Sequence, residues 1–347
     1  MSDRVPSLRD RFRGCLLGGA VGDALGAPVE FDRWPQIAAK FGEGGIRDYA
    51  PAYGRKGAIT DDTQMTLFTV EGLLRAHQRG REKGICDPYT VLRFAYERWL
   101  ATQEPTASPP SSPGWLFGVR ALHSRRAPGN TCLSALRAPW SDAVNGIAAN
   151  DSKGCGGVMR VAPIGLVEAN PYEFASRAAA ITHGHPLGYE SAGALALIVA
   201  KFPTAESIEA AALLAMEEVK GEIRNWLQRA LELARSDQPA HLAMRQLGEG
   251  WVAEEALAVG LFAALRGRDF EEAVVLAVNH SGDSDSTGSI AGQLVGTFAG
   301  VHSIPARWLD ELELRLDIEI LADDLYDYFH YRGRRSEEEW WQRYPGV

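Results

Sequence analysis

Residues 61–77 read DDTQMTLFTVEGLLRAH, and this stretch decides the fold class. Side chains at the spacing of one helix face recur along it, at Met65, Phe68, Val70, Leu73, Leu74 and His77. Runs that alternate between apolar and polar residues, which would predict half-buried strands, are nearly absent from the rest of the chain. The sequence therefore predicts an all-α protein.

The same helical pattern continues through the C-terminal half of the chain. Residues 205–235 are rich in Ala, Leu, Glu, Lys and Arg, which predicts one or two amphipathic helices. The periodicity of apolar side chains predicts further helices over residues 251–265, 270–278, 290–298 and 306–329.

One stretch interrupts this pattern. Residues 101–114, ATQEPTASPPSSPG, are rich in Pro and Ser, which predicts a loop or the edge of a mobile lid. The stretch is short and the composition is alike on both sides of it, so it does not mark a domain boundary. No repeat of solenoid length is present either. We therefore expect one domain over residues 1–347, large enough to bury a substantial core.

The composition excludes several classes of protein. Of 347 residues, 46% are hydrophobic and 23% are charged, as in ordinary globular proteins. The net charge of -9 disfavours general nucleic-acid binding, because an acidic surface repels phosphate backbones. No signal-peptide core or membrane-length apolar stretch is present, which disfavours secretion and membrane insertion. The four cysteines lack zinc-finger spacing, so we expect reduced thiols in a cytoplasmic protein.

The first candidate site is Thr60-Asp61-Asp62, at the predicted start of a helix. Adjacent carboxylates and a hydroxyl offer the hard oxygen ligands that Mg²⁺ prefers. The same residues also suit a purely structural role, because acids at a helix N-terminus interact favourably with the helix dipole. Asp61 as N-cap, with Gln64 three residues later, would resemble a capping box. This segment alone does not decide between the two interpretations.

The second candidate site is residues 280–288, HSGDSDSTG. Asp283 and Asp285, with hydroxyls beside them, again suit a hard cation. An EF-hand would need Glu at its twelfth position, which is Leu294. An aspartyl-phosphate phosphatase would need a strand before the first Asp, near the start of its domain. The EF-hand interpretation fails on this residue and the phosphatase interpretation is weak, which leaves half of a bipartite metal site or a polar capping turn.

The two acidic segments are far apart in sequence, and each stands at the predicted start of a helix. Two converging helix N-termini could supply four carboxylates to a pair of cations, roughly 3.5–4 Å apart. Four carboxylates so close together would repel one another without bound cations. We therefore expect a dinuclear metal site.

Three other segments are candidates for ligand contact. Residues 18–31, GGAVGDALGAPVEF, lack a phosphate-loop motif, so the small residues predict close helix packing, while Glu30 could project into a site. Residues 152–160, SKGCGGVMR, could present backbone N–H groups to phosphate or form a plain loop. His183 and His185 lack a third soft ligand for zinc, so contact with an organic ligand, or a structural role, suits them better.

Taken in order, these segments resemble the ADP-ribosylglycohydrolase family, which includes the dinitrogenase-reductase-activating glycohydrolase. The resemblance runs from about Arg11 to Gly300 and rests on GCLLGGAVGDALGAPVEF, TDDTQMT, GCGGVMRVAPIGL, THGHPLGYESA and NHSGDSDSTGSIAGQLVG. Each motif alone is modest evidence, but all five in this order are very specific. The resemblance implies a compact, orthogonal multi-helix bundle that binds two Mg²⁺ or Mn²⁺ ions at the bottom of a cleft.

The resemblance also implies roles for individual residues. The implied metal ligands are Thr60, Asp61, Asp62, Asp283, Asp285 and Ser286. Position 286 is often Thr in the family. Catalytic roles are implied for Glu30, Asp61, Asp62 and Asp283. Contacts with ADP-ribose are implied for Gly154, Cys155, Gly156, Gly157, Met159, His183 and Tyr189. Relatives often carry another small or polar residue at position 155.

The implied reaction is hydrolysis of the glycosidic bond between ADP-ribose and an acceptor on a protein or small molecule, with release of ADP-ribose. Paired cations would bind the ribose hydroxyls and lower the pKa of a water, and bond cleavage would develop oxocarbenium-like charge. Two alternatives stay open: a metal-dependent phosphohydrolase and a catalytically inactive ADP-ribose-binding protein. The sequence fixes neither the acceptor, such as arginine, serine or a nucleobase, nor the choice between Mg²⁺ and Mn²⁺.

Overall fold

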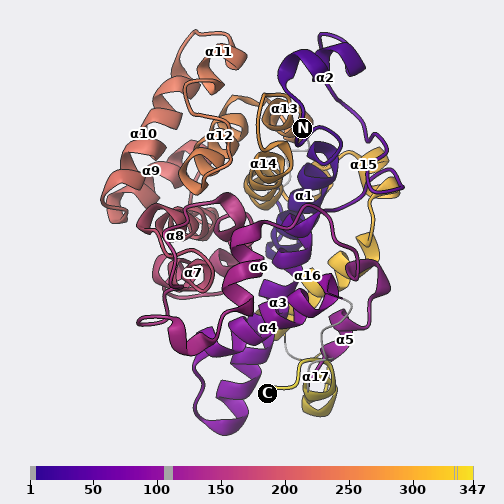
Figure 1. The fold of residues 1–347 in the computed structure, drawn as a ribbon, viewed down its shortest axis with the longest axis vertical. Coiled ribbons are helices and arrows are strands. Elements are labelled where there is room, and N and C mark those ends of the chain that lie inside the picture. The colour runs from indigo at the N-terminus through magenta and orange to yellow at the C-terminus, as the bar shows by residue number, and fades with distance from the viewer. Residues whose placement is uncertain (1–4, 105–111, 332, 334, 347) are drawn as a thin grey trace.

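The structure is a computed structural model that describes residues 5–104, 112–331, 333 and 335–346 (Figure 1). Its helices are α1 (Leu8–Gly26), α2 (Trp34–Phe41), α3 (Asp61–Lys83), α4 (Pro88–Gln103), α5 (Gly114–Phe117), α6 (Asn130–Arg137), α7 (Pro171–Ala180), α8 (Pro186–Lys201), α9 (Ile208–Glu218), α10 (Glu222–Arg235), α11 (Ala240–Met244), α12 (Ala253–Arg266), α13 (Phe270–Val278), α14 (Ser284–Ala299), α15 (Ala306–Glu311), α16 (Arg315–His330) and α17 (Glu337–Arg343). Within the described ranges, β-type pairing is limited to isolated bridges, so the predicted all-α fold is confirmed.

Helices α1 and α14 form the centre of the bundle, and their backbones touch (Figure 1). The contact consists of paired glycines, namely Gly14 with Gly296, Gly18 with Gly292, and Gly22 with Gly288. A Cβ atom built on Gly22 would lie 1.9 Å from the carbonyl oxygen of Gly288, a distance that no side chain tolerates. At the end of α1, Gly26 packs in the same way against the backbone of Asp285. The predicted use of small residues for close helix packing is confirmed.

The glycine contact leads to a stability prediction. We expect Gly22→Ala to lower the free energy of unfolding by roughly 3 kcal/mol or more, because two buried helix backbones must separate. The matched control is Gly80→Ala in α3, where the added methyl would meet only the Cβ of Cys86, at 3.6 Å. Alanine is the better helix former, so this control should be neutral or stabilising. Denaturant unfolding of both variants tests the prediction, and equal midpoints would contradict it.

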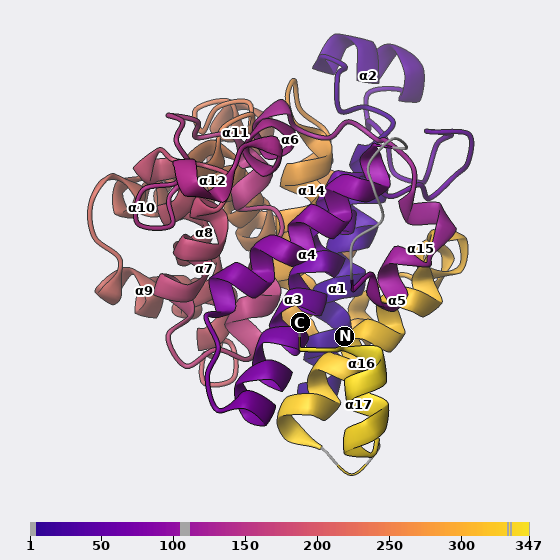
Figure 2. The same ribbon diagram turned by 60° about the horizontal axis from the view of Figure 1, so that its bottom comes forward.

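The remaining helices surround this central pair. Figures 1 and 2 show α7 to α12 gathered on one side of α1, and α15 to α17 on the opposite side. In both views α2 projects from the body of the molecule. No helix in the described part of the chain combines the length and apolar character needed to cross a membrane.

Most predicted helices are present, with one clear error. Residues 205–235 form two helices, and 270–278 is α13 as predicted. The single helix expected over 306–329 is wrong, because the chain breaks between α15 and α16, where Leu314 adopts a φ of +56°. This turn delivers the buried carboxylate of Glu313 to the guanidinium of Arg126. Hydrophobic periodicity cannot predict a long-range ion pair of this kind.

Two further boundaries differ from expectation. Residues 101–103 of the predicted Pro/Ser-rich loop belong to α4, and residues 105–111 lie outside the described residues. Helix α14 begins at Ser284 rather than at 290, so residues 284–294 are all helical, whereas an EF-hand needs most of them as a calcium-binding loop. The single domain expected over residues 1–347 stays a prediction.

Candidate active site

The N-termini of α3 and α14 open into one pocket. Thr60, rather than Asp61, is the N-cap of α3, and its hydroxyl accepts a hydrogen bond from the backbone N–H of Asp62 at 3.4 Å. Asp283 caps α14 and accepts from the N–H of Ser286, also at 3.4 Å. Because α13 and not a strand precedes Asp283, the phosphatase motif is excluded. The structural role and the site role therefore occur together. Each helix start is capped, and each also brings acidic side chains to the shared pocket.

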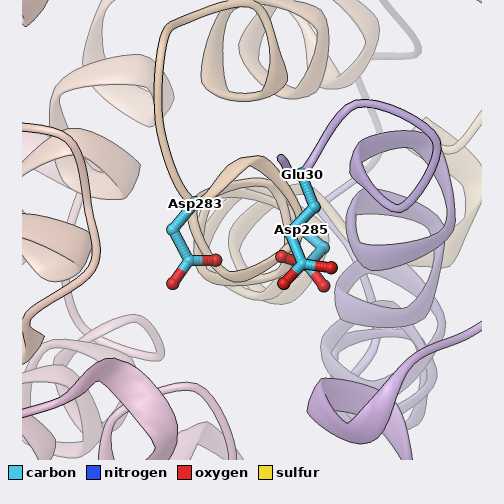
Figure 3. A group of neighbouring side chains, drawn as sticks. All are labelled: Glu30, Asp283 and Asp285. Carbon is cyan, nitrogen blue, oxygen red and sulfur yellow. The ribbon is translucent and has the colours of Figure 1, made fainter. Parts of the chain in front are cut away.

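Three carboxylates from two elements meet at the end of this pocket. Glu30, Asp283 and Asp285 each place one oxygen within 4.8 Å of the others, and all three side chains are buried. Figure 3 shows Glu30 reaching from the loop after α1 toward the two aspartates at the start of α14. Asp61 and Asp62 from α3 line the same pocket. The structure thus brings together all five acids that the sequence singled out.

The acids are in an environment that opposes their ionisation. Burial, followed by repulsion from Asp285 and Asp283, raises the pKa of Glu30 to about 11. Burial and the charge of Asp285 also raise the pKa of Asp61 and Asp62 well above the usual value. One oxygen of Asp62 and one of Glu30 are buried without a hydrogen-bond partner. The negative charge of so many buried carboxylates must be balanced by bound cations or removed by protonation. Because all the donor atoms are oxygens, hard divalent cations fit this cluster.

Sequence reasoning missed the role of Asp23, which is fully buried on α1. Its carboxylate accepts hydrogen bonds from the N–H of Thr60 at 3.0 Å, from the Thr60 hydroxyl at 2.8 Å, and from the N–H and hydroxyl of Thr63. Burial, followed by the charge of Asp285, raises the pKa of Asp23 to about 7. The only available signal was a single acid within the apolar stretch of α1. Asp23 fixes the first turn of α3 and thereby the direction of its acids.

The glycine loop forms the wall of the pocket. Gly154, Cys155, Gly156, Met159 and His183 line it, whereas Gly157 and Tyr189 are not among the lining residues. The Cys155 thiol donates a hydrogen bond to Oδ2 of Asp283 at 2.8 Å, and burial raises the pKa of this thiol well above its usual value. The loop is thus joined directly to the acidic end of the pocket.

A second residue that the sequence did not single out, Arg160, holds the loop from behind. Its buried guanidinium donates to the carbonyl of Gly156 at 3.0 Å and to the hydroxyl of Thr182 at 2.8 Å. The Thr182 hydroxyl lies 2.8 Å from Nδ1 of His183. Burial, followed by the charge of Arg160, lowers the pKa of His183 to about 3, so this imidazole is neutral. Its Nε2 lies beside Gly154 and Gly156 of the glycine loop.

The whole pocket has a volume of about 520 Å³, which suits a small-molecule ligand. Its lining combines five acids with a glycine loop and a neutral histidine. The model of the ADP-ribosylglycohydrolase family matches residues 4–335 of the sequence. The chain belongs to the ADP-ribosylglycohydrolase family.

Individual relatives agree with this assignment. An uncharacterized protein of Archaeoglobus fulgidus is 31% identical, over 92% of this chain and 97% of its own. The ADP-ribosyl-[dinitrogen reductase] glycohydrolase of Rhodospirillum rubrum is 27% identical, over 91% of this chain and 94% of its own. Human ADP-ribosylhydrolase ARH3 is 25% identical, over 92% and 93%. A solved structure described as an ADP-ribosylglycohydrolase-related protein complex has 31% identity and a TM-score of 0.62, covering 92% of this chain and 98% of its own.

The ADP-ribosylglycohydrolase family and the names of its members point to hydrolysis of ADP-ribosyl bonds. The family resemblance and the enzyme class inferred from the five motifs are therefore confirmed. The residues matched by the family model span the acidic segments, the glycine loop and the histidine segment. The pocket described above lies within the part of the chain that the family model matches.

Proposed function

We propose that the protein is a cytoplasmic hydrolase that cleaves the glycosidic bond between ADP-ribose and an acceptor, with two divalent cations, Mg²⁺ or Mn²⁺, as cofactors. The observation that carries this proposal is the convergence of Glu30, Asp283 and Asp285 with the acids of α3 in one pocket. The acceptor belongs to an ADP-ribosylated protein or a small molecule, and ADP-ribose is released. The four cysteines are free, which supports a reducing compartment.

The proposed metal ligands are Thr60, Asp61, Asp62, Asp283, Asp285 and Ser286. The buried oxygen of Asp62 that has no hydrogen-bond partner supports this set. The Ser286 hydroxyl supports it as well, because its contact with the sulfur of Met159, at 3.9 Å, is weak. Divalent cations at such a site polarise ribose hydroxyls and lower the pKa of a water.

The protein's own acids would orient the reacting groups. We assign Glu30, Asp61, Asp62 and Asp283 to this task. Glu30 comes from a different element than the aspartates and approaches them from the loop after α1, so it can reach an attacking water or the leaving group and move a proton. The aspartates hold the ribose side of the scissile bond, where their negative charge stabilises an oxocarbenium-like transition state.

The wall of the pocket would bind the ADP portion. We assign the diphosphate and the distal ribose to the loop of Gly154, Cys155, Gly156, Gly157 and Met159, because glycine-rich backbone can approach phosphate oxygens closely. His183 and Tyr189 belong to the segment that shapes this cleft. The neutral His183 has one ring nitrogen beside Thr182 and the other beside the loop, so it can bind a ligand without adding charge.

A panel of substrates tests the proposed function. Peptides ADP-ribosylated on arginine or serine, and ADP-ribosylated nucleic acid, are incubated with Mg²⁺, Mn²⁺ or a chelator, and the products are separated by chromatography. We expect ADP-ribose with an intact diphosphate, and a rate at least roughly 100-fold lower with the chelator, because the acids cannot act on ribose without their cations. Release of AMP or phosphate would instead indicate a phosphohydrolase. Binding of ADP-ribose without cleavage of any conjugate would indicate an inactive binding protein.

A further inference from the structure

A sulfur atom lies among the carboxylates of the pocket. Cys155 lines the same pocket as the five acids, and its thiol donates a hydrogen bond to Oδ2 of Asp283 at 2.8 Å. Burial, followed by the charges of Asp283 and Asp62, raises the pKa of this thiol. In Figure 3 the carboxylate of Asp283 stands apart from those of Glu30 and Asp285. The thiol therefore adds a different kind of ligand atom on the Asp283 side of the acidic cluster.

One turn holds the thiol and this carboxylate in place. The N–H of Cys155 donates to the carbonyl of Trp251 at 3.3 Å, and the N–H of Asp283 donates to the carbonyl of Glu249 at 2.8 Å. The carbonyl of the residue after Cys155 accepts a hydrogen bond from the buried guanidinium of Arg160 at 3.0 Å. The main chain thus fixes the sulfur beside Asp283 before any ligand binds, as a preorganised metal site requires.

Two buried oxygens in the pocket lack a positive partner. Asp62 is 3% exposed, and its Oδ1 has no hydrogen-bond partner among the described residues. Oε2 of Glu30 is buried in the same state. The thiol of Cys155 carries a single proton, which it already donates to Asp283, so it satisfies neither oxygen. A cation between the sulfur and the carboxylates would satisfy them.

The ligand atoms around such a cation are not all hard. A thiolate is a soft ligand that favours Zn²⁺, whereas Mg²⁺ takes oxygen ligands. We propose that Cys155 and the carboxylates of Asp283 and Asp62 form a site for a thiophilic divalent cation, of which Zn²⁺ is the representative. On binding, the cation takes the place of the thiol proton, which passes to solvent, and the sulfur ligates as a thiolate.

This site makes the enzyme sensitive to zinc. The inference rests on the proposed function, because Asp283 and Asp62 are also proposed ligands of the Mg²⁺ or Mn²⁺ that supports turnover. For a given set of ligands, Zn²⁺ binds more tightly than Mn²⁺, and the sulfur increases this difference. Zn²⁺ therefore displaces the cation that the reaction uses and inhibits hydrolysis.

The first test measures the bond between sulfur and metal and needs no substrate. Metal-free wild-type protein is titrated with Cd²⁺, a thiophilic probe whose bond to a thiolate absorbs in the ultraviolet. We expect this absorption to saturate in the wild type and to be missing from Cys155→Ser. Asp283→Asn should keep the absorption but weaken Cd²⁺ binding at least roughly tenfold, because a carboxylate ligand is lost.

Cys132→Ser and Cys86→Ser are the matched controls. The buried Cys132 also lines the pocket, but its sulfur accepts a hydrogen bond from Arg160 at 3.5 Å, and Cys86 is not among the lining residues. Both variants should keep the Cd²⁺ absorption. Absorption that survives in Cys155→Ser, or that disappears in Cys132→Ser, would overturn the proposed site.

The second test measures inhibition by Zn²⁺ of the Mn²⁺-loaded protein on a conjugate that it cleaves, with each variant compared to its own rate without Zn²⁺. We expect the concentration for half inhibition to rise at least roughly thirtyfold in Cys155→Ser, while the affinity for Mn²⁺ by calorimetry changes less than about threefold. Equal inhibition of wild type and variant would overturn the proposal. Cd²⁺ absorption that depends on Cys155, in a protein that cleaves no conjugate, would support the thiol site and refute the proposed function instead.

Discussion

The double variant Asp283→Asn, Asp285→Asn is expected to lose at least roughly a thousandfold in turnover and to show no Mn²⁺ binding by calorimetry. The two substitutions remove two of the negative charges that would hold the cations, and an amide is a much weaker ligand than a carboxylate. They keep the size of both side chains, and asparagine at position 283 still serves as the N-cap of α14. The loss would therefore come from the site and not from the fold.

Measurements of thermal stability distinguish a loss of metal binding from a loss of folding in this double variant. Without metal, the double variant should unfold at a higher temperature than the metal-free wild type, because it replaces two carboxyl groups whose ionisation is opposed by burial and, for Asp283, by the charge of Asp285. The matched control is Asp269→Asn, since Asp269 caps α13 in the same way but lies outside the acidic pocket. This control should keep full turnover. Turnover within tenfold of wild type in the double variant would refute the proposed metal site.

Removal of divalent cations is expected to make the folded protein less stable as the pH rises from 7 to 8.5. Glu30 has a pKa raised to about 11, so in the metal-free folded state it keeps a proton that the unfolded chain, with an ordinary value of 4.5, has lost. A folded state that binds more protons than the unfolded state loses stability as the pH rises. One such group costs about 1.4 kcal/mol per pH unit, or about 2 kcal/mol over this window.

Between pH 7 and 8.5, the two buried histidines do not oppose this loss of stability. Burial lowers the pKa of His183 to about 3 and of His280 to about 4, so these residues favour folding as the pH rises, but only up to the ordinary value of 6.5. Asp23, with a pKa of about 7, adds to the loss from Glu30 at the start of the window. Calorimetric melting with chelator should show the decline, and saturating Mn²⁺ should abolish it. Melting temperatures that rise with pH in chelator would contradict the predicted effect.

The sequence predicted the acids of the site better than the residues that position those acids. Asp61 and Asp285 stand in dense polar clusters at helix starts, so composition and spacing were sufficient to find them. Asp23 acts through hydrogen bonds to Thr60 and Thr63, about forty positions away, and no local pattern reports such a contact. A family resemblance, and not the physical pattern alone, distinguished Glu30 from a solvated surface acid.

The same limit applies to the fold and to the mouth of the pocket. Helix periodicity predicted α13 to the residue but joined α15 to α16. The break between them, with its positive φ at Leu314, accompanies the ion pair between Glu313 and the distant Arg126, which periodicity does not report. Phe31 and Trp251, which line the pocket, are 220 positions apart and are both of a type that sequence analysis assigns to the core by default. Only the folded chain shows that they meet outside it.

The glycine contact between α1 and α14 has a consequence for the way the site tolerates change. Glu30 follows the end of α1, and Asp283 and Asp285 stand at the start of α14. The spacing of these acids therefore depends on two backbones that are in direct contact at paired glycines. The carboxylates are therefore preorganised by the main chain. Substitutions in the surrounding loops can alter which substrate enters, while the arrangement of the carboxylates that would bind cations depends on the helix pair and stays the same.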